Sequence, residues 1–100
     1  MPKIIPLEVI SVEHKVDALT RLRRIEGQVK GLQKMVEEGR YCVEVLQQLA
    51  AVQEALRGVT KVIMRNYLEN CATNALRSGD AEDARAIYDE LMRVIFKFSK

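Results

Sequence analysis

The chain contains almost nothing that would interrupt a helix. Among its 100 residues there are two prolines, and both lie at the start, at Pro2 and Pro6. A proline inside a helix removes a backbone hydrogen bond and clashes with the preceding turn, so the sequence after Pro6 can form long helices. The alternating pattern of a half-buried strand is absent, as are internal repeats and low-complexity tracts. We therefore expect an all-α protein.

Long apolar runs are missing as well. No stretch approaches the roughly 20 apolar residues that span a bilayer. The first residues, MPKIIPLEVISVEHK, include a short apolar stretch, but an acid interrupts it and there is no small-residue cleavage site. We expect a cytoplasmic protein without membrane contact, in which the two cysteines begin as reduced thiols.

Histidine is scarce, and this argues against an enzyme. His14 is the single histidine, and it lies far in the sequence from Cys71. A thiol-dependent enzyme needs a base beside its nucleophile, and the sequence also lacks a glycine-rich phosphate loop and an acid pair. We therefore expect no enzymatic activity. We expect His14 to be an exposed residue near the start of the first helix rather than a metal ligand.

Apolar residues recur at helical spacing in three segments. The first helix should begin near Ser11, a good N-cap, and stop at Gly39. The second should run from about residue 42 to residue 77, and the third should start after Asp80, its N-cap. Four apolar residues of the third helix should face inward: Ile87, Leu91, Val94 and Ile95.

The second helix is too long to be covered by its own chain. A helix of about 36 residues extends about 54 Å. One helix of similar size and a short third helix cannot cover so long an apolar stripe. The pattern therefore predicts that the middle helix packs against another subunit.

The two cysteines support such a subunit contact. Cys42 and Cys71 are 29 positions apart (71 minus 42), which places both on nearly one face of a helix. Along the helix axis they would be about 44 Å apart, whereas a disulfide needs α-carbons within about 7 Å. An antiparallel dimer would bring Cys42 beside Cys71 of the other subunit. The alternative is that both are buried cysteines that act as small apolar residues.

Charge is distributed unevenly along the chain. The stretch from residue 80 to residue 90 is acidic, with five acids against Arg85. An earlier segment is basic, with six cations against two acids: Lys15, Arg21, Arg23, Arg24, Lys30 and Lys34. A basic stripe on one element suggests a polyanionic partner, although a solvated helix face gives the same pattern.

Two stretches resemble a known family. LTRLRRIEGQVKGLQKMVEEGRYCVEVLQQLAAVQEAL and NYLENC resemble the copper-sensing repressor family, the grouping of CsoR, RcnR, FrmR and CstR, over about residues 15–97. The resemblance implies a three-helix protomer with a long central helix, an antiparallel dimer that assembles into a tetramer, and repression by binding double-stranded operator DNA. Residues 1–10 would then be an N-terminal tail, and residues 11–100 a single DNA-binding and sensor domain.

The resemblance also makes DNA the expected polyanion. Contacts should come from the first helix, where the spacing of cations suits phosphates and one groove-facing edge. The residues expected to bind DNA are Arg21, Arg23, Arg24, Gln28 and Lys30.

Tyr67 departs from the copper sensors of this family. The resemblance implies that they bind copper through a cysteine at the position of Cys42, and through a histidine and a second cysteine from the partner. The histidine falls at Tyr67 and the second cysteine at Cys71. A protonated phenol is a poor ligand for a soft monovalent metal. The persulfide-sensing, CstR-type branch keeps the two cysteines without that histidine, so this sequence is most similar to that branch. A tyrosine that merely packs in the dimer fits Tyr67 equally well.

We therefore expect a repressor that reactive sulfur releases from DNA. Cys42, activated by the helix N-terminus and the Arg40 guanidinium, would take sulfur from a persulfide, and the partner's Cys71 would close a di-, tri- or tetrasulfide bridge. Tyr41, Tyr67 and Glu90 are expected near this site. This hypothesis needs no cofactor and no metal. The alternative is a copper(I) sensor that uses the same two cysteines.

Overall fold

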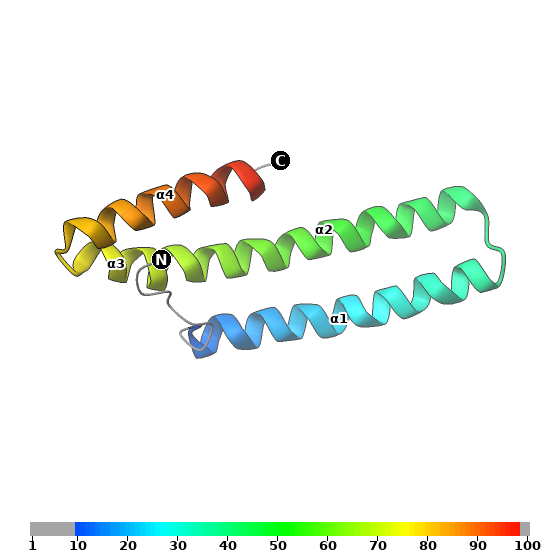
Figure 1. Ribbon diagram of the computed structural model, residues 1–100. Helices are drawn as coiled ribbons and strands as arrows, with labels where there is room; N and C mark the ends of the chain where they lie inside the picture. Colours follow the sequence, from blue (N-terminus) through cyan, green and yellow to red (C-terminus); the bar gives the residue numbers. More distant parts are fainter. Residues whose placement is uncertain (1–9, 99–100) are drawn as a thin grey trace. The chain divides into compact units, whose positions relative to one another are not determined.

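A computed structural model describes residues 10–98, and helices account for nearly all of them (Figure 1). No strand occurs within this range, so the all-α prediction is confirmed. The helices are α1 (Val12–Glu37), α2 (Cys42–Asn66), the π-helix η2 (Tyr67–Ala72), α3 (Thr73–Arg77) and α4 (Ala81–Phe98). None of the helices described is long and apolar enough to cross a membrane. The tail expected at residues 1–10 lies, except for residue 10, outside the described residues.

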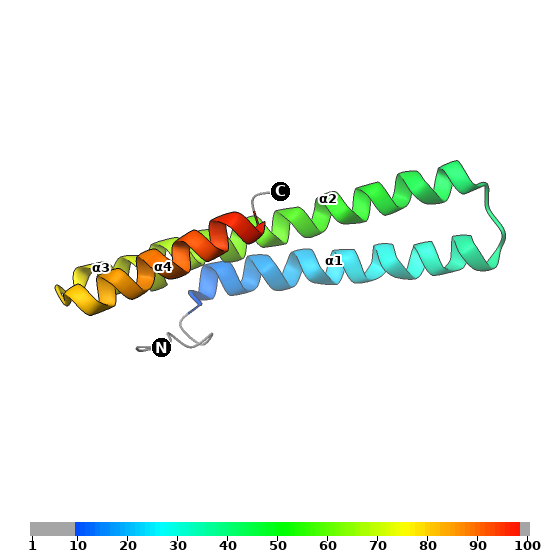
Figure 2. The same cartoon turned by 45° about the horizontal axis from the view of Figure 1, so that its top comes forward.

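Residues 12–64 form one compact unit, made of α1 and of α2 up to Met64. The two helices run side by side in both views and are joined by a short turn (Figures 1 and 2). Ile25, Leu32 and Val52 form the buried centre, because their spacing directs one face of each helix toward the other. The first helix ends at Glu37, two residues before the predicted stop at Gly39, whose φ of 69° is in the left-handed region that glycine adopts at no steric cost.

Residues 65–98, together with residues 10–11, belong to a second compact unit. Here α4 packs against α3, and Ala72 and Ile87 are buried. The predicted N-cap is confirmed, because Oδ1 of Asp80 accepts a hydrogen bond from the backbone N–H of Glu82 at 2.8 Å. Of the four residues expected inward on α4, Ile95 differs, since half of its surface is exposed in the protomer.

The predicted second helix is helical throughout but not uniform. Residues 67–72 form a π-helix, in which the backbone N–H of Thr73 bonds to the carbonyl of Leu68, five residues back. The Thr73 hydroxyl donates to the same carbonyl at 2.7 Å. A π-helical turn is rare and occurs often at functional sites. This one contains both Tyr67 and Cys71.

Candidate thiol site and basic surface

Cys71 lies half-buried in the π-helical segment. Burial disfavours its charged form and raises the pKa of the thiol, and the negative charge of Glu90 on α4 raises it further. Cys71 is therefore held as a neutral thiol, and a metal or an electrophile must displace its proton.

Tyr67 is tied to the same carboxylate. Its hydroxyl donates a hydrogen bond to Oε1 of Glu90 at 2.6 Å, a length typical of a hydroxyl bonded to a charged carboxylate. Burial and Glu90 raise the pKa of the phenol well above its ordinary value, and the positive charge of Arg93 opposes this only in part. Tyr67 therefore remains a neutral hydrogen-bond donor.

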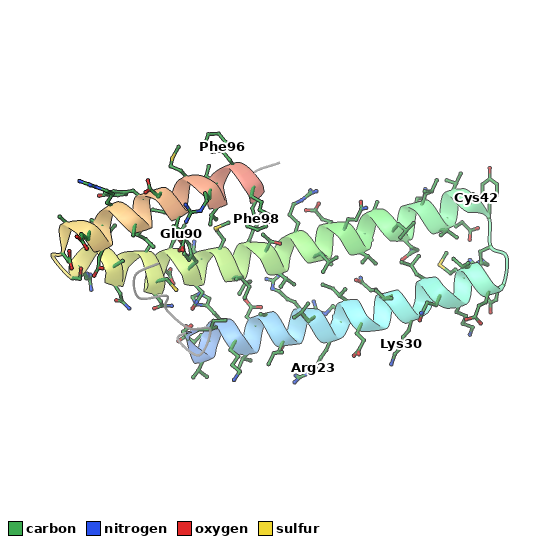
Figure 3. All side chains as sticks on the ribbon, viewed as in Figure 1. Arg23, Lys30, Cys42, Glu90, Phe96 and Phe98 are labelled. Atoms are coloured by element: carbon green, nitrogen blue, oxygen red, sulfur yellow. The ribbon has the colours of Figure 1, made fainter. Side chains whose placement is uncertain are left out.

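The local fold explains how these groups meet. Tyr67 and Cys71 come from one π-helical turn, and Glu90 comes from α4, which folds back so that its side chain points toward η2 (Figure 3). Tyr67 and Glu90 thus lie in the same unit as Cys71, and their place beside a sensing site stays a prediction. Their hydrogen bond joins residues 23 positions apart and carries no sequence signal.

Cys42 has a different environment. It is the first residue of α2, directly after the turn, and it is exposed (Figure 3). The Arg40 guanidinium, expected to activate this thiol, forms an ion pair with Glu44 at 2.7 Å. The guanidinium therefore lies against a carboxylate in the first turn of α2. Tyr41 is also exposed.

One protomer does not assemble a metal site from these residues. Within residues 10–98, no group of three or more histidine, cysteine, aspartate or glutamate side chains is placed to hold a metal ion. His14 is half-buried in α1 rather than exposed. The two thiols therefore remain separate candidate ligands.

The basic surface lies on α1. Arg21, Arg23, Arg24 and Lys30 are exposed, and Arg23 and Lys30 point away from α2 (Figure 3). In the part of the chain that the structure describes, Arg23, Arg24 and Lys30 form no ion pair. Gln28 differs from them, since it is half-buried and its amide oxygen is enclosed without a hydrogen-bond partner.

Arg21 reaches toward α2. Its guanidinium pairs with Asp17 at 2.8 Å, and a β-carbon added at Gly58 would lie 2.9 Å from one of its nitrogens. Gly58 thus leaves room for the guanidinium beside α2. Sequence reasoning missed this role, although a glycine inside a helix is a signal, because it costs about 1 kcal/mol relative to alanine.

A row of exposed cations on one helix is the electrostatic footprint of a protein that binds nucleic acid. Residues 14–97 match the family model described as "Metal-sensitive transcriptional repressor", and the chain belongs to this family. The prediction that the chain is not an enzyme is thereby confirmed.

Several characterised proteins are similar to the chain. The copper-sensing transcriptional repressor CsoR of Bacillus subtilis is 43% identical over 90 residues, which cover 90% of this chain and 86% of that protein. The copper-sensing transcriptional repressor RicR of Mycobacterium tuberculosis is 43% identical over 67% of this chain and 70% of its own length. The crystal structure of the copper-sensing repressor CsoR with Cu(I) from Geobacillus thermodenitrificans superposes with a TM-score of 0.80 at 40% identity, covering 97% of this chain and 95% of that one.

These comparisons correct one prediction and leave another unconfirmed. The expectation that no cofactor or metal is involved is wrong, because the relatives are copper-sensing repressors and the solved structure is described with Cu(I). Assignment to the persulfide-sensing branch is not confirmed. The copper-sensing alternative agrees better with these relatives.

Proposed function

We propose that the chain is a copper(I)-responsive repressor of transcription. In this proposal the sulfurs of Cys42 and of the partner's Cys71 bind copper(I), and binding lowers the affinity of the protein for operator DNA. The observation that carries the proposal is the presence of two free thiols in a chain whose relatives are copper-sensing repressors.

The donor set fits this metal. Thiolate sulfur is a soft ligand and suits copper(I), a soft metal ion. Copper(I) also accepts two ligands, whereas metals such as zinc need about four. Binding would release the proton from Cys71, so copper(I) overcomes the burial that keeps this thiol neutral.

The two thiols require a second protomer to meet. Cys42 begins α2, and Cys71 follows the end of that 25-residue helix. An antiparallel pair of protomers would place the start of one α2 beside the end of the other, which forms two equivalent sites per dimer. Apolar side chains along α2 support such pairing, since Leu46, Leu49 and Leu56 are 61%, 41% and 44% exposed in the protomer.

We expect the protein to be a tetramer built from such dimers. A single protomer leaves too many large apolar side chains exposed on α1, α2 and α4 to remain alone in water. Sedimentation equilibrium at micromolar concentration should give a tetramer with and without reducing agent, because the contacts are not disulfides. A species that sediments as a monomer would contradict both the assembly and the shared site.

Copper(I) should release the protein from DNA. The DNA probe would be a duplex selected from a random pool for tight binding, and the measurement would be fluorescence anisotropy during an oxygen-free titration. Release should be complete at about one copper(I) per protomer, the stoichiometry that two shared sites per dimer require. Zinc(II) at the same concentration serves as the control and should leave the complex intact.

Reactive sulfur is a second candidate inducer, and the absence of an imidazole beside Cys71 favours it. In that case an organic persulfide would release the DNA and leave a covalent dimer linked through Cys42 and the partner's Cys71. Retention of DNA under saturating copper(I), together with release by persulfide, would overturn the copper proposal in favour of this one.

A further inference from the structure

Two potential metal ligands beside Cys71 are already bonded to each other. The Tyr67 hydroxyl lies one π-helical turn before Cys71, and the Glu90 carboxylate is close enough to act on the charge of both residues. These oxygens form one hydrogen bond of 2.6 Å. The bond uses the proton of the phenol and one lone pair of Oε1, and it fixes the position of the carboxylate relative to the phenol.

We infer that the Tyr67–Glu90 hydrogen bond is the selectivity element of the site, because it holds the Glu90 carboxylate in place against the phenol and leaves the two sulfurs as the metal ligands. This inference rests on the proposed copper(I) function. A site of two thiolates accepts ions that are satisfied by linear coordination, such as copper(I) and silver(I). It rejects zinc(II) and cobalt(II), which require further ligands.

The hydroxyl of Tyr67 has a role that an aromatic ring without a hydroxyl would not supply. A phenylalanine would also be unable to bind a metal, but it would leave Glu90 without its hydrogen-bond donor. The released carboxylate, next to Cys71, would then be available as a hard ligand that suits divalent ions. Tyr67 therefore acts as a positioning residue through Glu90, and its hydroxyl is the group that matters.

The hydrogen bond joins two residues of the same protomer. A hydroxyl that donates to a carboxylate makes one of the stronger hydrogen bonds found in proteins. The hydrogen bond thus persists without copper and is built into the fold rather than induced by the metal.

Three variants test the inference. Tyr67→Phe removes only the hydroxyl, Glu90→Gln removes only the charged carboxylate, and the double variant Tyr67→Phe/Glu90→Gln removes both. The measurements are the thermal midpoint of the metal-free protein, the number and type of copper(I) ligands by X-ray absorption, and the cobalt(II) affinity from its visible absorption bands. The thermal midpoint verifies that each variant is folded.

The wild type should show copper(I) with two sulfur neighbours and no oxygen or nitrogen neighbour. Tyr67→Phe should keep two sulfurs on copper(I) but bind cobalt(II) about tenfold or more tightly than the wild type, the scale of a change in the ligand environment. The double variant should lose this gain, since the freed carboxylate is gone. Glu90→Gln alone should also bind cobalt(II) weakly.

Tyr67→His provides the opposite test. An imidazole at this position would add a nitrogen ligand to copper(I) and allow cobalt(II) to bind. Equal cobalt(II) affinity in the wild type and Tyr67→Phe, or a third light-atom ligand in the wild-type copper(I) spectrum, would overturn the inference while leaving the proposed function intact. A wild-type protein that binds no copper(I) at all would instead overturn the proposed function, and this inference with it.

Discussion

Replacing either cysteine with serine should abolish release of DNA by copper(I). A serine hydroxyl is a hard, neutral oxygen and does not replace a thiolate on a soft metal. Cys42→Ser and Cys71→Ser should therefore retain operator binding but no longer hold copper(I) against a competing chelator. Anisotropy with the selected DNA duplex would measure the first property, and chelator competition the second.

A mixture of the two variants tests whether the site is shared. In a dimer with one Cys42→Ser and one Cys71→Ser protomer, one site has lost both thiols and the other has kept both. Random exchange of subunits should restore about one quarter of the wild-type copper(I) sites. A site formed within one chain would remain broken in every protomer. If the mixture bound no copper(I) after exchange, the antiparallel pairing would be excluded.

The second large effect should come from the basic face of α1. Replacing Arg24 with alanine should weaken operator binding and lower the slope of log affinity against log salt by about 0.9 for each DNA phosphate that the arginine no longer neutralises. Because an assembly repeats the residue in every protomer, the effect recurs at each protomer that touches the DNA. Filter binding or anisotropy at several salt concentrations would measure the slope.

Two further variants make this test specific. Arg21→Ala should have a smaller effect than Arg24→Ala, because Asp17 already neutralises part of its charge. Arg85→Ala removes a cation from the acidic helix α4 and serves as the matched control. If Arg85→Ala lowered the salt slope as much as Arg24→Ala, the DNA surface would not be on α1.

Local signals made most of the fold predictable from the sequence. Gly39 and Asp80 mark helix ends because a left-handed φ and an N-cap are local properties of single residues. Cys42 and Cys71 could be named as candidate ligands because cysteines are few and their separation in the sequence places both on nearly one helix face; their role as ligands stays a prediction. The exposed side of α1 followed from the positions of its arginines.

Contacts between distant residues could not be predicted. The hydrogen bond between Tyr67 and Glu90 depends on how α4 folds back, and nothing near either residue indicates it. The place of the Arg21 guanidinium beside Gly58 depends in the same way on how α1 meets α2. The π-helix could not be predicted for another reason. Its apolar residues recur every three or four positions, and this spacing fits an ordinary α-helix equally well.

The π-helical turn contains one residue more than an α-helical turn in the same place would. In an α-helix each backbone N–H bonds to the carbonyl four residues back, whereas in this turn it bonds to the carbonyl five residues back, so the turn accommodates one extra residue. Removing one residue between 67 and 72 would let the segment wind as an α-helix while Thr73 and the residues after it keep their facing. The folding of α3 and α4 would tolerate such a deletion, whereas the spacing of Tyr67 and Cys71 would not. The chain can therefore lose or change its sensor chemistry by a one-residue change in length without losing its fold.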